Sequence, residues 1–83
     1  MPDVAPPEEE VLAAFGRAVR KVRLERGFTQ EGLAEAAGIH PRYVSDVERG
    51  QRNVGMVNID RMAGALSVDL PTLMAEVEAQ RRG

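Results

Sequence analysis

The run from Gln30 to Val47 constrains this chain more than any other stretch, because its small and apolar residues are spaced like two short helices joined by a tight corner. Counted from Gln30, the fifth position must be small where the two helices meet, and it is Ala34. The ninth position must accept a positive φ at the corner, and it is Gly38. The positions where the two helices must share a core are all apolar: Leu33, Ala37, Ile39, Val44 and Val47. This pattern predicts a helix-turn-helix rather than an unrelated helical hairpin.

The rest of the chain predicts three further helices and no strand, since no segment alternates with a period of two. Caps and breakers bound the five helices: the first ends near Glu25, the second follows a Thr29 cap, the third runs from a His40 cap to Arg49-Gly50, the fourth starts near Gly55, and Asp69 caps the fifth. The predicted core face of the fourth helix is Met56, Ile59, Met62, Ala63 and Leu66. We expect residues 1–7 to form a disordered arm and residues 8–83 to form one all-α domain.

Charge is distributed unevenly along the chain. The formal net charge is −2 at pH 7. Between Arg17 and Arg52, however, there are eight basic and five acidic residues, whereas acidic residues predominate towards both ends. A mildly basic centre with an acidic rim fits a protein that contacts phosphates with one face. A mixed, solvated surface would give the same charges along the sequence.

Composition excludes several other classes of function. The 83 residues include no cysteine, and the single histidine, His40, has no neighbouring carboxylates at metal-ligand spacing. Neither a nucleophile–base pair nor a phosphate-binding loop occurs, so we expect no metal, no cofactor, no small-molecule ligand and no enzymatic activity. No apolar run could span a membrane and no signal peptide is recognisable, so we expect a cytoplasmic protein with no membrane partner.

From about Val19 to Met74, the chain resembles the Cro/phage-repressor (XRE) family of helix-turn-helix regulators. The residues that carry the resemblance are Arg23, Gly27-Phe28-Thr29-Gln30, Leu33-Ala34, Ala37-Gly38-Ile39, Val44-Ser45, Glu48-Arg49-Gly50, Arg52-Asn53, Met62-Ala63 and Ala65-Leu66. Within the family, the segments 23–30, 43–45 and 52–54 look most like the controller proteins of restriction-modification systems, which are small homodimeric regulators.

The resemblance implies a five-helix, lambda-repressor-like fold with the helix-turn-helix at the second and third helices, and double-stranded DNA as the partner. Two residues depart from the family pattern. Gly32 replaces a charged helix former, and Pro41 stands at a base-reading position that often carries a polar residue.

Base-reading side chains are expected on the exposed face of the third helix, because Val44 and Val47 take its core face. Besides Pro41, that face presents Arg42, Tyr43 and Asp46. Arg42 can donate two hydrogen bonds to guanine O6 and N7 in the major groove. Tyr43 can contact a phosphate or a thymine methyl. Asp46 can accept from cytosine N4, repel a wrong site, or steer Arg42.

A second set of residues is expected to hold phosphates. The resemblance implies that Gln30 and the free N–H groups at the start of its helix bind one phosphate. Arg49, Arg52 and Asn53 follow the third helix and are placed for phosphates across the groove, with an exposed loop as the alternative. Ser45 either contacts the DNA backbone or packs between helices.

The resemblance further implies that Arg23 and Glu48 form a structural salt bridge between the first and third helices.

The fifth helix and the turn before it carry more apolar residues than one small domain can cover. We therefore expect Val68, Leu70 and Met74 to stay exposed and to form a homodimer interface.

The sequence thus predicts a sequence-specific transcriptional regulator that binds a near-palindromic operator as a homodimer. The alternative is an antitoxin or other protein-interaction module on the same fold. The basic residues Arg42, Arg49 and Arg52, together with Gln30, argue against that alternative, because an interaction-only domain has no need of them.

Overall fold

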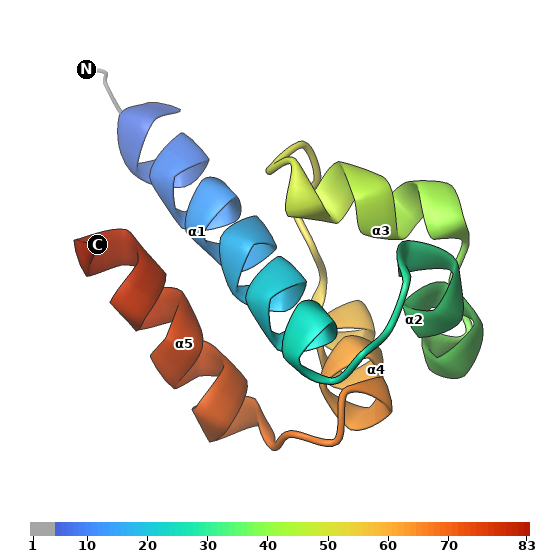
Figure 1. The fold of residues 1–83 in the computed structure, drawn as a ribbon. Coiled ribbons are helices and arrows are strands. Elements are labelled where there is room, and N and C mark those ends of the chain that lie inside the picture. The colour runs from blue at the N-terminus through green and yellow to red at the C-terminus, as the bar shows by residue number, and fades with distance from the viewer. Residues whose placement is uncertain (1–4) are drawn as a thin grey trace.

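The computed structural model describes residues 5–83, and within that range it contains five α-helices and no strand (Figure 1). The helices are α1 (Ala5–Glu25), α2 (Gln30–Ala37), α3 (Pro41–Glu48), α4 (Met56–Ala65) and α5 (Leu70–Arg82). The all-α prediction and the five-helix architecture are therefore confirmed. None of the helices in this part of the chain is long and apolar enough to cross a membrane.

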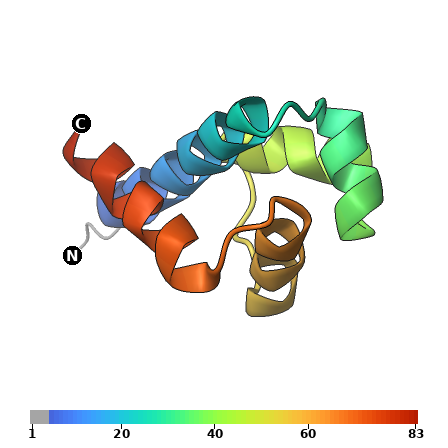
Figure 2. The ribbon, with the colours of Figure 1, turned by 60° about the horizontal axis from the view of Figure 1, so that its bottom comes forward.

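The long helix α1 is the axis of the fold. Helix α5 lies antiparallel beside it on one side, and α2 and α3 lie on the other side (Figures 1 and 2). Helix α4 contacts both α2 and α5, and so links the two sides. In this arrangement α3 lies at the edge of the molecule, with one face packed on α1 and α2.

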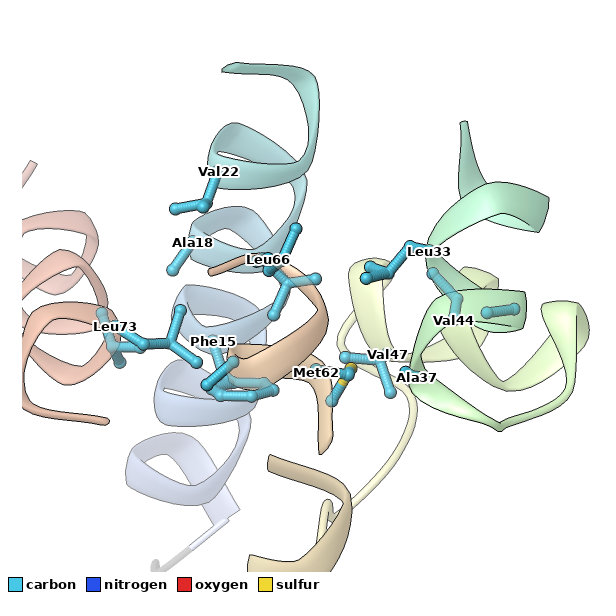
Figure 3. Close-up of a cluster of buried hydrophobic side chains, with 14 of the residues drawn as sticks. Phe15, Ala18, Val22, Leu33, Ala37, Val44, Val47, Met62, Leu66 and Leu73 are labelled. Carbon is cyan, nitrogen blue, oxygen red and sulfur yellow. The ribbon is translucent and has the colours of Figure 1, made fainter. Parts of the chain in front are cut away.

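One hydrophobic cluster joins all five helices, and Figure 3 shows its central side chains. Its buried members are Ala14, Phe15, Ala18, Val19, Val22, Leu33, Ala34, Ala37, Val44, Val47, Met62, Ala63, Leu66, Leu73 and Val77. Full burial of a leucine or valine side chain contributes about 1.5–3 kcal/mol to folding. The apolar stripes predicted for the helices therefore meet in one core.

Local side-chain caps set where three of the helices begin. The Thr29 hydroxyl, the His40 Nδ1 atom and the Asp69 carboxylate each accept a hydrogen bond from a backbone N–H two or three residues further on, at 2.9 to 3.0 Å. Pro41 follows His40 at the start of α3, where a missing N–H donor costs nothing. These caps were predicted from the sequence and are confirmed.

The ends of the first four helices share one geometry. Gly27, Gly38 and Gly50 have φ values of 79°, 71° and 73°, and Ser67, after α4, has φ 61°. In each case the next N–H bonds back to the carbonyl five residues earlier, as in a Schellman motif. A left-handed conformation costs a non-glycine residue roughly 1–2 kcal/mol. Ser67 therefore carries strain that the three glycines avoid, and the left-handed turn there was not predicted.

Two predicted details at helix starts are wrong. Helix α1 begins at Ala5 rather than at residue 8, so residues 5–7 of the predicted arm are helical, and residues 1–4 lie outside the described range. Pro6 and Pro7 are compatible with this start, because the first turn of a helix needs no N–H donors. Met56, predicted in the core, is 66% exposed. It lies in the first turn of α4, where the apolar stripe extends beyond the helices that cover it.

The residues expected to remain exposed near α5 fall into two groups. Met74 is 37% exposed. Val68 and Leu70 are half-buried and pack against the core, so the expectation of exposure is wrong for them. For Val68 the left-handed turn at Ser67 is the reason, because the Val68 N–H donates back to the Ala63 carbonyl in α4. Met74 is therefore the most accessible of the three.

Gly16 fixes how closely α1 approaches α3. An added Cβ atom would lie closer to the carbonyl oxygens of Val47 and Glu48 than van der Waals contact allows. Backbone atoms cannot swing aside as side chains do, so any larger residue would push the two helices apart. Gly16 therefore holds the end of α3 against α1, which positions the side chains that leave α3.

Candidate nucleic-acid interface

The corner between α2 and α3 sets the angle at which α3 leaves the core. Gly38 is in the left-handed conformation, and the Ile39 N–H donates to the Ala34 carbonyl at 2.9 Å. Ala34 is only 1% exposed where the two helices meet, so a larger side chain there would have to displace packed neighbours. The structure thus confirms the helix-turn-helix that the sequence predicted.

Helix α3 has one buried face and one free face. Val44 and Val47 are buried in the core, and the side chain of Glu48 is buried at the end of the helix. Arg42 is exposed, with 73% of its side chain accessible, and Tyr43 is half-buried beside it. Pro41 is also exposed, at the helix start. Of the four positions predicted to read bases, Pro41 and Arg42 are therefore exposed, whereas Tyr43 packs partly against the core and the Asp46 side chain is only 14% exposed.

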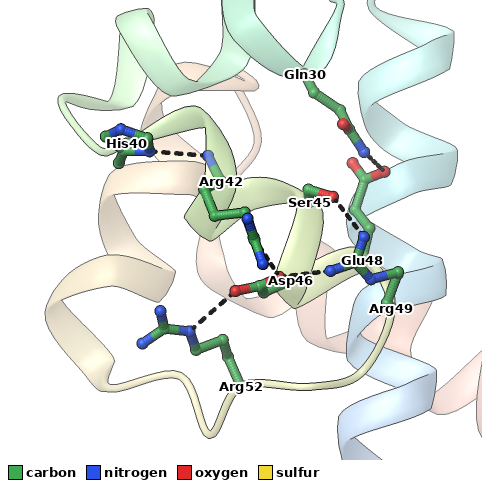
Figure 4. Close-up of polar contacts among 8 residues, drawn as sticks. All are labelled: Gln30, His40, Arg42, Ser45, Asp46, Glu48, Arg49 and Arg52. Atoms are coloured by element: carbon green, nitrogen blue, oxygen red, sulfur yellow. Dashed lines mark hydrogen bonds and ion pairs between the residues drawn. The ribbon is translucent and has the colours of Figure 1, made fainter.

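Asp46 lies at the centre of a group of three arginines (Figure 4). Its Oδ1 atom accepts from Arg49 Nη2 at 2.6 Å and from Arg42 Nε at 3.4 Å, and its Oδ2 atom lies 3.5 Å from Arg52 Nε. Arg49 also donates from Nη1 to the Ser45 hydroxyl at 3.1 Å. One carboxylate thus gathers three cationic side chains on the free face of α3 and the loop after it, and we call this group the Asp46 cluster.

The Asp46 cluster carries a net positive charge that the chain as a whole lacks. Three guanidinium groups surround one carboxylate, and the Arg52 guanidinium also stacks over the Tyr43 ring, 5.0 Å from its centre. Stacking orders Arg52 while leaving part of its N–H donors free. The cluster can therefore donate hydrogen bonds to anionic or acceptor-rich groups in front of α3.

A buried salt bridge supports α3 from behind. Arg23 donates from Nε and Nη2 to the two carboxylate oxygens of Glu48, at 2.6 and 3.0 Å, and from Nη1 to the Phe28 carbonyl at 2.9 Å. The side chains of Arg23 and Glu48 are only 8% and 3% exposed. Hydrogen bonding to Glu48 raises the pKa of the Arg23 guanidinium further above its ordinary value. The predicted link between the first and third helices is present.

Gln30 belongs to this buried network as well as to the surface. Its Nε2 atom donates to Glu48 Oε1 at 3.0 Å (Figure 4). The side chain is half-buried, at the first position of α2. From the sequence, Gln30 was predicted only to bind a phosphate. Its hydrogen bond to Glu48 of the buried pair was not predicted.

The structure does not bring every predicted phosphate contact into one group. Ser45, Arg49 and Arg52 belong to the Asp46 cluster, whereas Asn53 borders a separate apolar cavity of about 200 Å³ among α1, α4, α5 and the loop before α4. The Asp46 cluster as a group was not predicted from the sequence. Arg42 lies four residues before Asp46 and Arg49 three residues after it, and this spacing could have indicated the cluster, since side chains at these distances are neighbours on a helix.

Comparison with known proteins shows the same family along most of the chain. A family model described as Helix-turn-helix matches residues 19–73. The control protein C.BamHI of Bacillus amyloliquefaciens is 43% identical over 61 residues, which are 72% of this chain and 75% of that protein. The solved restriction-modification controller protein C.AhdI from Aeromonas hydrophila is 45% identical, with a TM-score of 0.73 over 75% of this chain and 94% of that one.

A third similar protein has been solved in complex with DNA. The controller protein C.Esp1396I, solved as a tetramer in complex with its natural 35 base-pair operator, has a TM-score of 0.82 at 26% identity, over 88% of this chain and 96% of that one. The residues 19–73 that the family model matches include α2, α3 and the whole Asp46 cluster. The chain belongs to the XRE-type helix-turn-helix family of DNA-binding transcriptional regulators.

Proposed function

We propose that this chain is a controller-type regulator that binds a near-palindromic operator as a homodimer, with α3 of each subunit in the major groove. Two-fold symmetry would then set the two half-sites about one helical turn apart, roughly 34 Å. Because the target is DNA, we expect it to act in the cytoplasm.

The observation that carries this proposal is the Asp46 cluster. Arginine is the residue that most often reads guanine and also binds phosphate, and three arginines lie together on the free face of α3 and the loop after it. Arg42, near the start of α3, is assigned to bases, and Arg49 and Arg52, further along, are assigned to phosphates. Gln30, whose amide is held by Glu48, is assigned to a phosphate at the start of α2.

Met74 supports the dimeric part of the proposal. It is an exposed apolar side chain on α5, and it also borders the apolar cavity of about 200 Å³. A second copy of the chain would remove this side chain from water. We propose that α5 and the turn before it form the two-fold interface, with Val68 and Leu70 at its margin and Met74 inside it.

Replacing Arg42 by alanine is expected to weaken operator binding by about 1–3 kcal/mol and to relax the preference at one base position in each half-site. The operator can be found by selecting bound duplexes from a randomised library of roughly two helical turns. Selection with the Arg42→Ala variant then shows which position has lost its preference.

Two results would contradict the proposal. Selection with the native chain could enrich no duplex, which would favour a protein-interaction module of the antitoxin kind. Alternatively, the Arg42→Ala variant could keep full affinity and the same base preferences, which would remove Arg42 from the reading surface. A suitable control is Arg20→Ala, because Arg20 is an exposed arginine on α1 outside the Asp46 cluster.

A further inference from the structure

We propose that Asp46 sets the ratio between operator affinity and non-specific DNA affinity, by acting as an internal substitute for a DNA phosphate. This inference rests on the proposed function. It assigns to Asp46 a positioning role that acts through the three arginines around it, rather than a direct contact with a base.

The carboxylate already occupies donors that phosphates would need. Both Nη atoms of Arg49 are engaged, one by Asp46 at 2.6 Å and one by Ser45 at 3.1 Å. Arg52 is held between Asp46 and the ring of Tyr43. To bind a phosphate through both Nη atoms, Arg49 must exchange or share the Asp46 carboxylate. Arg52 keeps its Nη donors, but its guanidinium already lies beside the same negative charge, so part of the energy of each phosphate contact is offset.

Arg42 is held differently from Arg49. Asp46 accepts from its Nε atom at 3.4 Å, and no hydrogen bond of its Nη atoms occurs within the described residues. A guanine is read by two donors of one guanidinium group, and Arg42 keeps its terminal donors for this purpose. Asp46 can therefore orient Arg42 without competing for the donors that read the base.

These two arrangements predict that Asp46 affects the two kinds of DNA to different extents. On a duplex without the right bases, binding rests on phosphates alone, and Asp46 both occupies the Nη donors of Arg49 and adds a negative charge beside Arg52 and near the DNA. On the operator, the same cost is offset because Asp46 holds Arg42 in its reading orientation. Asp46 thus lowers non-specific affinity more than operator affinity.

The test uses the Asp46→Asn variant, which keeps the size of the side chain and removes its charge. The probes are a duplex selected by the native chain and a scrambled duplex of the same composition, each titrated at several salt concentrations. We expect affinity for the scrambled duplex to rise roughly tenfold at 0.1 M salt and its salt slope to steepen by about 1, as for one added phosphate contact. Operator affinity should change by less than roughly threefold, so the ratio of operator affinity to scrambled-duplex affinity falls.

Two further variants separate this role from a general charge effect. Glu78→Gln makes the same change in net charge on α5, on the other side of α1 from α3, and should leave the ratio unchanged (Figure 1). Asp46→Glu restores the carboxylate and should return the salt slope on the scrambled duplex towards that of the native chain.

An equal change of Asp46→Asn affinity on both duplexes, or no change on either, would overturn the inference while leaving the proposed function intact. A loss of affinity on both duplexes that Asp46→Glu does not restore would assign Asp46 a purely structural role. If the native chain selects no duplex at all, it is the proposed function that fails.

Discussion

Replacing Glu48 by alanine is expected to lower the free energy of unfolding by about 3–5 kcal/mol. The substitution leaves the Arg23 guanidinium buried with only the Phe28 carbonyl as partner, and it removes the acceptor that holds the Gln30 amide. An unpaired buried charge costs far more than the intact pair gains. Urea unfolding followed by circular dichroism measures the change.

The exposed ion pair of Glu25 with Lys21 provides a matched control for this experiment. Its two side chains are 57% and 49% exposed, so Glu25→Ala should cost no more than about 1 kcal/mol. Replacing Arg23 by methionine and Glu48 by leucine together should recover much of the loss, because no charge is then left unpaired. If Glu48→Ala costs as little as Glu25→Ala, the buried pair does not hold α3 in place.

Replacing Met74 by glutamate is expected to give a folded monomer whose operator affinity falls by about 100-fold or more. The new charge would lie in the proposed two-fold interface, and two half-site contacts would no longer act as one unit. Met74 is a cleaner probe than Leu70, since Leu70 also packs against the core of its own subunit. Sedimentation at micromolar concentration and operator titration give the two measurements.

Ala75 offers a matched control, because it is exposed and adjacent on α5 but faces another direction. Ala75→Glu adds the same charge and should remain dimeric with operator affinity near that of the native chain. The proposed interface is wrong if the native chain is monomeric at micromolar concentration and Met74→Glu binds the operator unchanged.

Features that depend on neighbours in sequence could be predicted from the sequence. The caps at Thr29, His40 and Asp69 and the left-handed glycine at position 38 each follow from a few adjacent residues. The apolar stripes were also readable, since a helix repeats every 3.6 residues. Together these signals were enough to predict five helices and the helix-turn-helix.

Features that depend on how the helices pack could not be predicted in this way. Nothing local distinguishes Gly16 from a glycine on a free surface, because its role comes from the backbone of α3. Ser67 adopts a conformation that its residue type disfavours, and the packing of Val68 depends on that turn. The Asp46 cluster includes Arg52, whose place is set by the loop after α3 rather than by helical spacing.

The most direct test of the central claim is to map the DNA-binding face by NMR. The backbone amide signals of labelled protein are followed as the selected duplex is added. We predict that the largest changes fall at the start of α2, along α3 and in the loop to Arg52, and that the outer faces of α1 and α5 change little. The competing basic surface is a hollow of about 320 Å³ between α1 and α5, lined by Arg17, Arg20, Lys21, Leu24 and Gln80. Largest changes around that hollow, with α3 unaffected, would contradict the account.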